Sequence, residues 1–409
     1  MTKILPFSAI RPVRDKAHLV ATMPYYTYKK NVLVAKLEHN PYTFLHVLNP
    51  EFNQTQKTPP NSVERFNKIR EKFDEFVEDG IFIHDNKPCL YLYRQTKDGH
   101  QYLGLIAGAS VDQYNTGHIK KHEATITSRE EIFALYLDTV KFHAEPVLLF
   151  HERHENLSAL LNAITKHRPE YEYTSAERIK HEVWVIENQE AIAMIQKYYR
   201  EIPDVYIADG HHRCASSATY THQLGNNAKE TQQHFLAYFI SEDLMFIQDY
   251  NRIVRDLGDN TQASFIQKIE QNFILQKTND STCKPDKLHV IAMYFNSTWY
   301  KLTPKPDTFD QADSVNSLDT AILTNLLLEP VLGISDLKTD KRIDFISGNK
   351  GMSALQEAVD SGQFQVAFGL FPVTVSQLKQ VADEGKIMPP KSTWIEPKLR
   401  SGLTIYPLD

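Results

Sequence analysis

Short strand-like and helix-like patterns alternate along this chain of 409 residues, and they lack the regular spacing of βαβ units. Two apolar runs, 89–96 and 101–110, are joined by the turn signal Lys97-Asp98-Gly99 and predict a hairpin. Apolar residues at helical spacing predict a helix over 62–79 that ends at Gly80. Interleaved elements with hairpins favour the α+β class over a doubly wound parallel sheet.

The length predicts two or three domains, at a rough 150 residues per domain. The pattern restarts after the linker at 257–260, which is the best boundary that the sequence offers. We therefore expect a core region over 1–257 and a C-terminal α+β region over 258–409. The Pro-rich tail of the second region is expected to return to the functional site.

Composition narrows the classes of partner. Lys and Arg number 45 and Asp and Glu number 51, so the net charge is −6, which disfavours nucleic acid as a ligand. Three widely spaced cysteines predict reduced thiols, and neither a disulfide framework nor a structural zinc site. The first residues lack a signal-peptide pattern, and the longest apolar stretch is interrupted by polar residues and a proline. We expect a cytoplasmic protein with no membrane partner.

The most informative segment is Ile-Ala-Asp-Gly-His-His-Arg at 207–213, predicted at a strand-to-helix turn. Gly210 allows a close backbone approach, and the following helix N-terminus favours anions. Arg213 suits phosphate or carboxylate oxygens, while Asp209 could cap the helix, hold Mg²⁺ or accept a proton. His211 and His212 diverge on a helix but can converge at an irregular turn. The alternative is a capped turn with merely polar histidines.

The same segment resembles the hallmark of a bacterial family, domain of unknown function 1015. Further segments agree with that family: PFSAIRP near the start, MPYY at 23–26, NPYTFLHV at 40–47, IKKHEAT at 119–125, AEPVLLF at 144–150 and MPPKSTWIEPKLRSGL at 388–403. Relatives typically carry Pro-Tyr-Asp in the N-terminal loop, where this chain has Tyr26, so a role for that carboxylate does not carry over.

The Asp-Gly-His-His-Arg string also resembles the motif of free L-serine kinases, which have a ParB/sulfiredoxin-like fold. That resemblance implies a ParB-like core with a mixed sheet and large insertions. It further implies that Gly210 and Arg213 contact nucleotide phosphates, while Asp209, His211 and His212 flank the reacting groups. The implied activity is phosphoryl transfer from ATP, ADP or pyrophosphate to the hydroxyl of serine or a similar small molecule.

Two other segments carry candidate residues. In 120–125, Glu123 could deprotonate or orient a substrate hydroxyl and His122 could bind substrate, although a solvated loop is the alternative. Ser128 followed by Glu131 predicts a capping box for the next helix. The stiff tail offers phosphate contacts from Lys391, Ser392 and Thr393 and a substrate contact from Lys398, or is merely a strap anchored by Trp394.

Tyr25 and Arg252 complete the predicted substrate contacts, with a surface arginine on an amphipathic helix as the alternative for Arg252. The string His151-Glu152-Arg153-His154 is not a metal motif, and we predict no metal ligands in the chain. Mg²⁺ is expected as a companion of the phosphate donor. No P-loop and no Gly-x-Gly-x-x-Gly motif is present, which disfavours a P-loop kinase and a dinucleotide-dependent dehydrogenase.

The sequence thus predicts a small-molecule phosphotransferase, most simply one that acts on free L-serine. A non-catalytic sensor of nucleotides or phosphometabolites is the alternative, because it would use the same anion site without a base.

Overall fold

The computed structural model describes residues 1–409, except for the side chain of Tyr26. The chain divides into two compact units. The first unit contains Met1–Met245 and the last segment, Pro397–Asp409, and the second contains Phe246–Glu396. The boundary predicted between residues 257 and 258 therefore lies inside the second unit, after its first long strand.

The first unit contains both strands and helices. Its strands are β1 (Ile4–Leu5), β2 (Ile10–Pro12), β3 (Phe82–His84), β4 (Leu90–Lys97), β5 (His100–Ser110), β6 (Ile119–Lys120), β7 (Phe142–His143), β8 (Val147–His151), β9 (Tyr171–Thr174), β10 (Lys180–Ile186), β11 (Val205–Asp209), β12 (His234–Ser241) and β21 (Tyr406–Pro407). Its helices are α1 (Ala17–Val20), η1 (Tyr25–Thr27), α2 (Lys30–His39), α3 (Leu45–Leu48), α4 (Val63–Glu78), α5 (Val111–Asn115), α6 (Thr127–Val140), α7 (Glu155–Ile164), α8 (Gln189–Glu201), α9 (His211–Leu224), η2 (Gly225–Asn227), η3 (Thr231–Gln233) and η4 (Glu242–Leu244).

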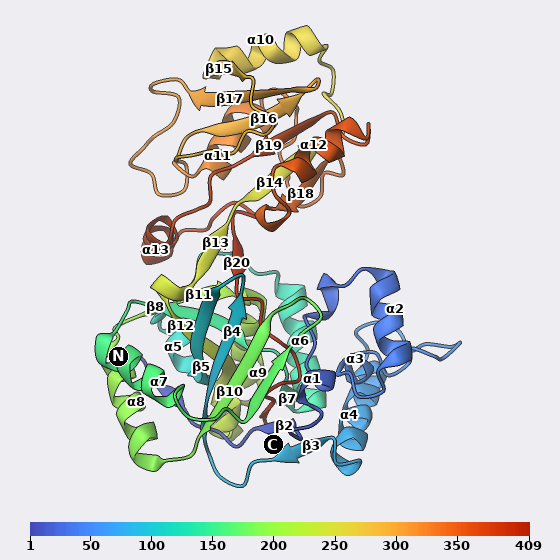
Figure 1. Cartoon of the computed structure of the whole chain (residues 1–409), viewed down its shortest axis with the longest axis vertical. Helices are drawn as coiled ribbons and strands as arrows, with labels where there is room; N and C mark the ends of the chain where they lie inside the picture. The colour runs from blue at the N-terminus through green and yellow to red at the C-terminus, as the bar shows by residue number, and fades with distance from the viewer. The chain divides into compact units, whose positions relative to one another are not determined.

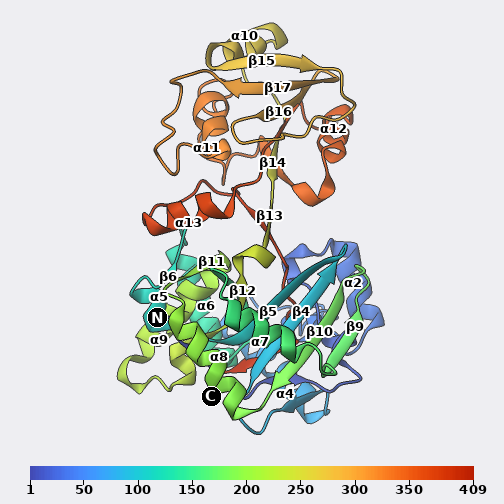
Figure 2. The same ribbon diagram turned by 60° about the vertical axis from the view of Figure 1, so that its left-hand side comes forward.

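A large mixed sheet organises the first unit (Figures 1 and 2). Its strand order in the described chain is β6-β11-β8-β12-β5-β4-β10-β9, with β1 added beside β5. The pairs β11–β6 and β12–β8 are parallel, and the other pairs are antiparallel. The prediction of a mixed sheet is confirmed.

The predicted hairpin is present as β4 and β5, in which Lys97 pairs with His100. The two turn residues between them, Asp98 and Gly99, both have positive φ, at 50° and 80°. Two positive φ values in a two-residue loop match the twist of the flanking strands. The local turn chemistry therefore fixes the register of the two central strands.

Helices α7 and α8 pack against this sheet through one apolar stripe each. The stripe of α8 consists of Ile192, Ile195 and Tyr199, and these side chains share a core with alternate residues of the strands. Cys214 of α9 is fully buried in the same core, where it is a small packing residue. Helix α4, predicted over 62–79, instead packs in a separate apolar cluster with α3 and β3.

The second unit is built around a sheet of its own, with the order β15-β17-β16-β19-β14-β18. Its strands are β13 (Phe246–Gln248), β14 (Tyr250–Val254), β15 (Phe273–Thr278), β16 (Ile291–Phe295), β17 (Thr298–Pro304), β18 (Ile343–Ser347), β19 (Val366–Gly369) and β20 (Trp394–Glu396), and its helices are α10 (Gln262–Asn272), α11 (Asp319–Leu323), the π-helix η5 (Thr324–Leu328), η6 (Gly348–Lys350), α12 (Ser353–Asp360) and α13 (Val375–Asp383). Alternation along β16 directs Met293 toward α10 and α11, and Tyr294 toward α12.

Two predictions of local structure were wrong. Helix α6 begins at Thr127 after Ile126, whose side chain makes no capping hydrogen bond, so Ser128 is not the N-cap. Arg252 lies on strand β14 and is fully buried, so it is not on the surface of an amphipathic helix.

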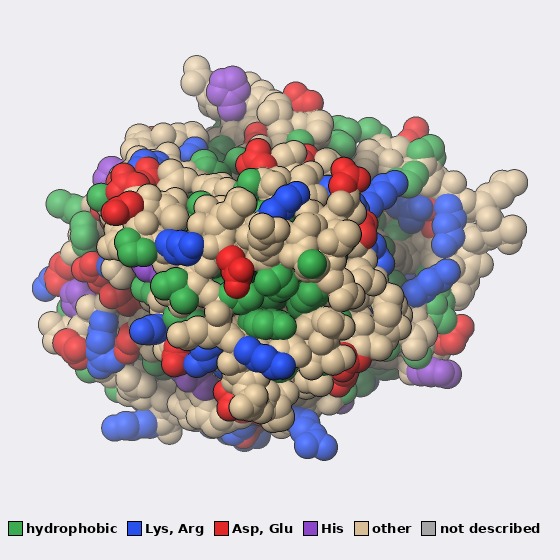
Figure 3. Space-filling view, turned by 90° about the horizontal axis from the view of Figure 1, so that it is seen from above, with side chains coloured by type: hydrophobic (Ala, Val, Ile, Leu, Met, Phe, Trp, Pro, Cys, Tyr) green, Lys and Arg blue, Asp and Glu red, His purple; other side chains and the backbone are tan. Residues whose placement is uncertain are grey.

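No helix in the described chain has both the length and the apolar character that crossing a membrane requires. On the face drawn in Figure 3, basic and acidic side chains are interspersed, so this face does not present a field of a single sign.

Candidate functional site

The turn between β11 and α9 positions the central motif. Strand β11 is buried up to Ala208 and ends at Asp209, and helix α9 begins at His211. Gly210 joins them with a φ of 107°, which L side chains rarely adopt. A Cβ at this position would lie 2.9 Å from Nε of Arg213, so the glycine also allows the guanidinium to fold back over the turn.

Four charged side chains meet at this turn. Lys398 Nζ donates to Asp209 Oδ2 at 3.0 Å, and Arg213 Nη2 lies 4.0 Å from Asp209 Oδ1. Arg213 Nη1 lies 2.7 Å from Glu145 Oε1 and donates to the carbonyl oxygen of Pro146 at 2.7 Å. Burial opposes ionisation of Asp209, but the charges of Lys398 and Arg213 outweigh it and lower the pKa of Asp209 below its ordinary value. The two cations are thus balanced by two carboxylates.

These side chains line a small cavity in the first unit. Polar residues from three distant segments face it, and apolar residues close its walls; its lining is Pro24, Glu145, Pro146, Leu148, Asp209, Arg213, Pro397, Lys398 and Leu399. The side chain of Asp209 is 35% exposed and that of Arg213 26% exposed, so both are partly open to solvent.

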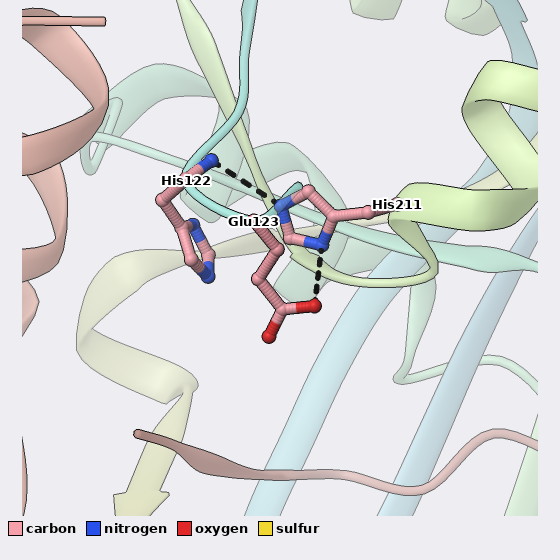
Figure 4. A group of neighbouring side chains, drawn as sticks. All are labelled: His122, Glu123 and His211. Carbon is pink, nitrogen blue, oxygen red and sulfur yellow. Dashed lines mark hydrogen bonds and ion pairs between the residues drawn. The ribbon is translucent and has the colours of Figure 1, made fainter. Parts of the chain in front are cut away.

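A second group of side chains lies at the start of the same helix (Figure 4). His211 Nδ1 is 3.4 Å from Glu123 Oε2, and the backbone N–H of His122 donates to His211 Nε2 at 3.3 Å. The rings of His122 and His211 are in edge contact, with centroids 4.5 Å apart. Burial lowers the pKa of His211 well below its ordinary value and that of His122 to about 4, so both imidazoles are neutral at pH 7.

The structure thus brings several predicted residues together in the first unit. Asp209, Arg213 and Lys398 share the cavity, and His122, Glu123 and His211 form the second group. His212, the next residue of α9, belongs to neither set. Tyr25 is half exposed in η1, and its neighbour Pro24 lines the cavity. The side chain of Tyr26 lies outside the described part of the chain.

Four predicted residues belong to the second unit. Ser392 is buried, with its hydroxyl 3.1 Å from that of Thr320 and donating to the carbonyl oxygen of Pro389. Lys391 is exposed and places Nζ 5.6 Å from the ring centroid of Tyr250. Thr393 is partly buried.

Arg252, the fourth of these residues, is enclosed by β14 and its neighbours. Its guanidinium lies 5.4 Å from the ring centroid of Phe345, and burial lowers the pKa of Arg252 to about 9. A side chain that is fully buried in this unit does not contact a solute in this arrangement, so the prediction of Arg252 as a substrate ligand is not supported by its position.

Sequence reasoning missed Glu145. This residue precedes the buried strand β8, and the apolar run 147–150 drew attention to a strand rather than to the acid before it. The available signal was its place in the segment AEPVLLF, which joins a charged residue and a proline to a strand end.

Comparison of the sequence with models of known protein families identifies the family of this chain. The model of the family "Protein of unknown function (DUF1015)" matches residues 4–321. The chain belongs to this family. Four of the family segments noted above supply the two groups of side chains: 119–125, 144–150 and 207–213, with Lys398 coming from 388–403, beyond the matched range.

No curated protein matches the chain. Among solved structures, a free serine kinase in complex with AMP gives a TM-score of 0.37 at 12% identity, covering 72% of this chain and 88% of that one. SbnI from Staphylococcus aureus, with a C-terminal truncation, gives 0.37 at 14% identity and covers 71% and 82%. A conserved hypothetical protein from Pyrococcus furiosus gives 0.34 at 13% identity and covers 74% and 94%.

Proposed function

We propose that this family member is a phosphotransferase that moves a phosphoryl group from ATP, ADP or pyrophosphate to the hydroxyl of a small molecule, with free L-serine as the first candidate. The observation that carries the proposal is the convergence of Asp209, Arg213 and Lys398 on one cavity at the N-terminus of α9. Phosphoryl transfer depends mainly on positioning and on electrostatic stabilisation, for which such a cluster is suited.

The donor phosphates are assigned to the N-terminus of α9. The first N–H groups of this 14-residue helix favour phosphate oxygens, and the absence of a side chain at Gly210 leaves room for the Arg213 guanidinium beside them. Lys398 and Arg213 supply positive charge at the same place. The predicted phosphate contacts of Lys391, Ser392 and Thr393 stay predictions from the sequence, and the ParB/sulfiredoxin-like core remains a proposal of the motif resemblance.

Mg²⁺ fits this donor set. Asp209 and Glu145 present two carboxylates to the cavity, and Mg²⁺ is typically held by one or two carboxylates together with phosphate oxygens and water. The lowered pKa of Asp209 keeps its carboxylate ionised and able to bind a cation. When bound, the ion would neutralise charge on the donor.

The acceptor hydroxyl attacks the terminal phosphorus, the bond to the leaving phosphate oxygen breaks, and the hydroxyl proton passes to a carboxylate. Asp209 is one candidate acceptor of the proton. A weak base is sufficient for this role, because phosphoryl transfer passes through a loose transition state. Glu123, 48% exposed and beside His211, is the other. The paired charges around the cavity also suit a zwitterion, and a free amino acid carries both signs.

The test follows phosphoserine formation from L-serine with each donor by mass spectrometry. We expect Asp209→Asn to lower kcat by about 10²- to 10⁴-fold if Asp209 accepts the proton, with pyrophosphate affinity within a few-fold of the parent. Glu123→Gln is the matched variant. If Glu123 accepts the proton, the same loss of kcat should appear in this variant instead. The proposal is refuted if no donor phosphorylates any member of a panel of small hydroxyl compounds.

One observation favours a second candidate, a non-catalytic nucleotide or phosphometabolite sensor. Arg213 and Lys398 are already paired with carboxylates, and Asp209 has a lowered pKa, which makes it a weak base. Donor binding without transfer, unchanged in both carboxamide variants, would identify the sensor.

A further inference from the structure

His122, Glu123 and His211 form a compact group that does not line the charged cavity (Figure 4). His122 and Glu123 follow strand β6, and His211 is the first residue of α9. One ligating atom from each of the three lies within 4.8 Å of the other two. In Figure 4 the carboxylate of Glu123 lies beside the ring of His211, next to its Nδ1 atom.

The ring of His122 is unusual among buried side chains. His122 is 0% exposed, and neither of its ring nitrogens has a hydrogen-bond partner among the described residues. A buried polar group without a partner is costly, and buried imidazoles are normally satisfied. One of these nitrogens lies within 4.8 Å of a ligand atom of Glu123 and of His211, so a ligand between the three residues would satisfy it.

We propose that His122, Glu123 and His211 bind one divalent transition-metal ion, Zn²⁺ in preference to Mg²⁺. Two imidazole nitrogens and one carboxylate oxygen form a donor set that suits Zn²⁺, whereas Mg²⁺ prefers oxygen ligands alone. Three protein ligands leave the fourth position of a tetrahedral ion open to water or to a solute. This site is argued from geometry alone, but it shares Glu123 with the proposed phosphotransfer, and a metal-bound Glu123 would leave Asp209 as the proton acceptor.

The spacing agrees with such a site. Metal bonds of about 2.0–2.1 Å in tetrahedral geometry place ligand atoms about 3.4 Å apart. The Nδ1 atom of His211 and Oε2 of Glu123 are already 3.4 Å apart, and one ring nitrogen of His122 lies within 4.8 Å of a ligand atom of each. Coordination through Nδ1 of His211 puts the ring proton on Nε2. With a proton on Nε2, the hydrogen bond that the His122 backbone N–H now donates to this atom at 3.3 Å would have to open on metal binding.

The sequence predicted no metal site, because His122 and Glu123 are adjacent and His211 is 89 residues away along the chain. No spacing rule for metal motifs covers this arrangement. The third ligand is supplied by the fold, through the parallel pairing of β6 with β11, which leads directly into α9.

The experiment adds Co²⁺ to the metal-free full-length protein and records its visible absorption, with Zn²⁺ and Mg²⁺ titrated by calorimetry. We expect one equivalent of Co²⁺ with the d–d bands of a four- or five-coordinate ion, displaced by Zn²⁺ and not by Mg²⁺. Glu123→Gln and His211→Asn should each weaken Zn²⁺ binding by about 100-fold or more. His118 is exposed and directly precedes β6. The variant His118→Asn is the matched control and should leave binding unchanged.

Circular dichroism of each variant separates loss of a ligand from loss of the fold. Glu123 is half exposed, so Glu123→Gln is expected to fold like the parent. The proposal is overturned if the parent protein gives no d–d bands, or if folded Glu123→Gln binds Zn²⁺ as tightly as the parent. Because neither readout measures phosphoryl transfer, failure of the metal site and failure of the proposed function are distinguishable.

Discussion

Arg213 lies between two carboxylates, and this arrangement limits how it can meet a phosphate. Its Nη1 atom is engaged by Glu145 and by the carbonyl oxygen of Pro146, while Nη2 faces Asp209 at a longer distance. A phosphate that binds Arg213 must compete with Glu145, because both present oxygen anions to the same guanidinium. The strength of phosphate binding is therefore set partly by Glu145.

Glu145→Gln should strengthen pyrophosphate binding by roughly 3- to 10-fold, because a partly exposed ion pair worth about 1 kcal/mol no longer competes. Calorimetric titration of pyrophosphate without Mg²⁺ measures the change, so that a role of Glu145 as a Mg²⁺ ligand does not enter. Glu187→Gln removes one negative charge from a surface pair with Lys87 and serves as the control for net charge. Weaker binding in Glu145→Gln would show that Glu145 holds Arg213 in its binding position instead.

Gly210→Ala should lower the free energy of unfolding by about 1–3 kcal/mol and weaken pyrophosphate binding. The φ of 107° is strained for any side chain, and the added Cβ must also displace Arg213. Gly117→Ala is the matched control, since Gly117 has a φ of 81° and open space around its Cβ position. Urea unfolding of both variants separates the conformational cost from the clash. Equal losses of stability and unchanged phosphate binding would contradict this account.

Single functional residues could be predicted where several reactive side chains are close together in the sequence. They could not be predicted where the residue that they contact is brought near only by the fold. The run 207–213 concentrates an acid, a glycine, two histidines and an arginine at a turn, so Asp209 and Arg213 could be found without a structure. Glu145 was missed because its partner Arg213 is 68 residues away, and only its place in a family segment marked it. The group around His122 depends on the pairing of two strands that the sequence did not align.

At the scale of elements, prediction succeeded where a pattern is long or a turn is specific. The spacing of Phe66, Ile69, Phe73 and Phe76 marked helix α4 correctly, and Ser62 caps it by accepting from the N–H of Arg65. The capping box at Ser128 failed because the helix begins at the residue before it. Helix starts are set by a few backbone angles, which the apolar pattern does not encode.

Strand β10 contains a histidine that should make stability depend on pH. His181 is fully buried, stacked on Tyr173, with Nδ1 2.8 Å from the hydroxyl of Tyr93. Burial, together with the charge of Arg400, lowers the pKa of His181 to about 3. The unfolded chain, with an ordinary pKa near 6.5, therefore binds one more proton than the folded chain between about pH 6.5 and pH 3.

The free energy of unfolding should consequently fall as the pH falls through this window, by about 1.4 kcal/mol per pH unit from His181 alone. His181→Gln should make the pH dependence shallower by that amount, although the variant is less stable at pH 7. Urea unfolding between pH 7 and pH 4 measures both slopes. His118→Gln, at an exposed position, should keep the parent slope, and an equally steep slope in His181→Gln would refute the assignment.

At the scale of the whole molecule, the second unit is a single insertion in the first. The chain leaves the first unit after Met245 and returns to it at Pro397. Phe246 and Glu396, the first and last residues of the insertion, are directly paired across β13 and β20. Composition changes little at either crossing, which is why the sequence placed the boundary at a later Gly-Asp-Asn turn.

This topology predicts that the two units fold separately. The ends of the insertion are adjacent, so joining Met245 to Pro397 through about four Gly and Ser residues should close the first unit without strain.

The segment 246–396 has apolar cores on both faces of its own sheet and should also unfold cooperatively. Calorimetry of the two shortened chains should give one transition each, near those of the parent. If the first unit alone keeps pyrophosphate affinity, then Asp209, Arg213 and Lys398 suffice for phosphate binding, whereas a loss of more than about tenfold would show that they do not. A segment 246–396 that aggregates or melts without a cooperative transition would contradict the division itself.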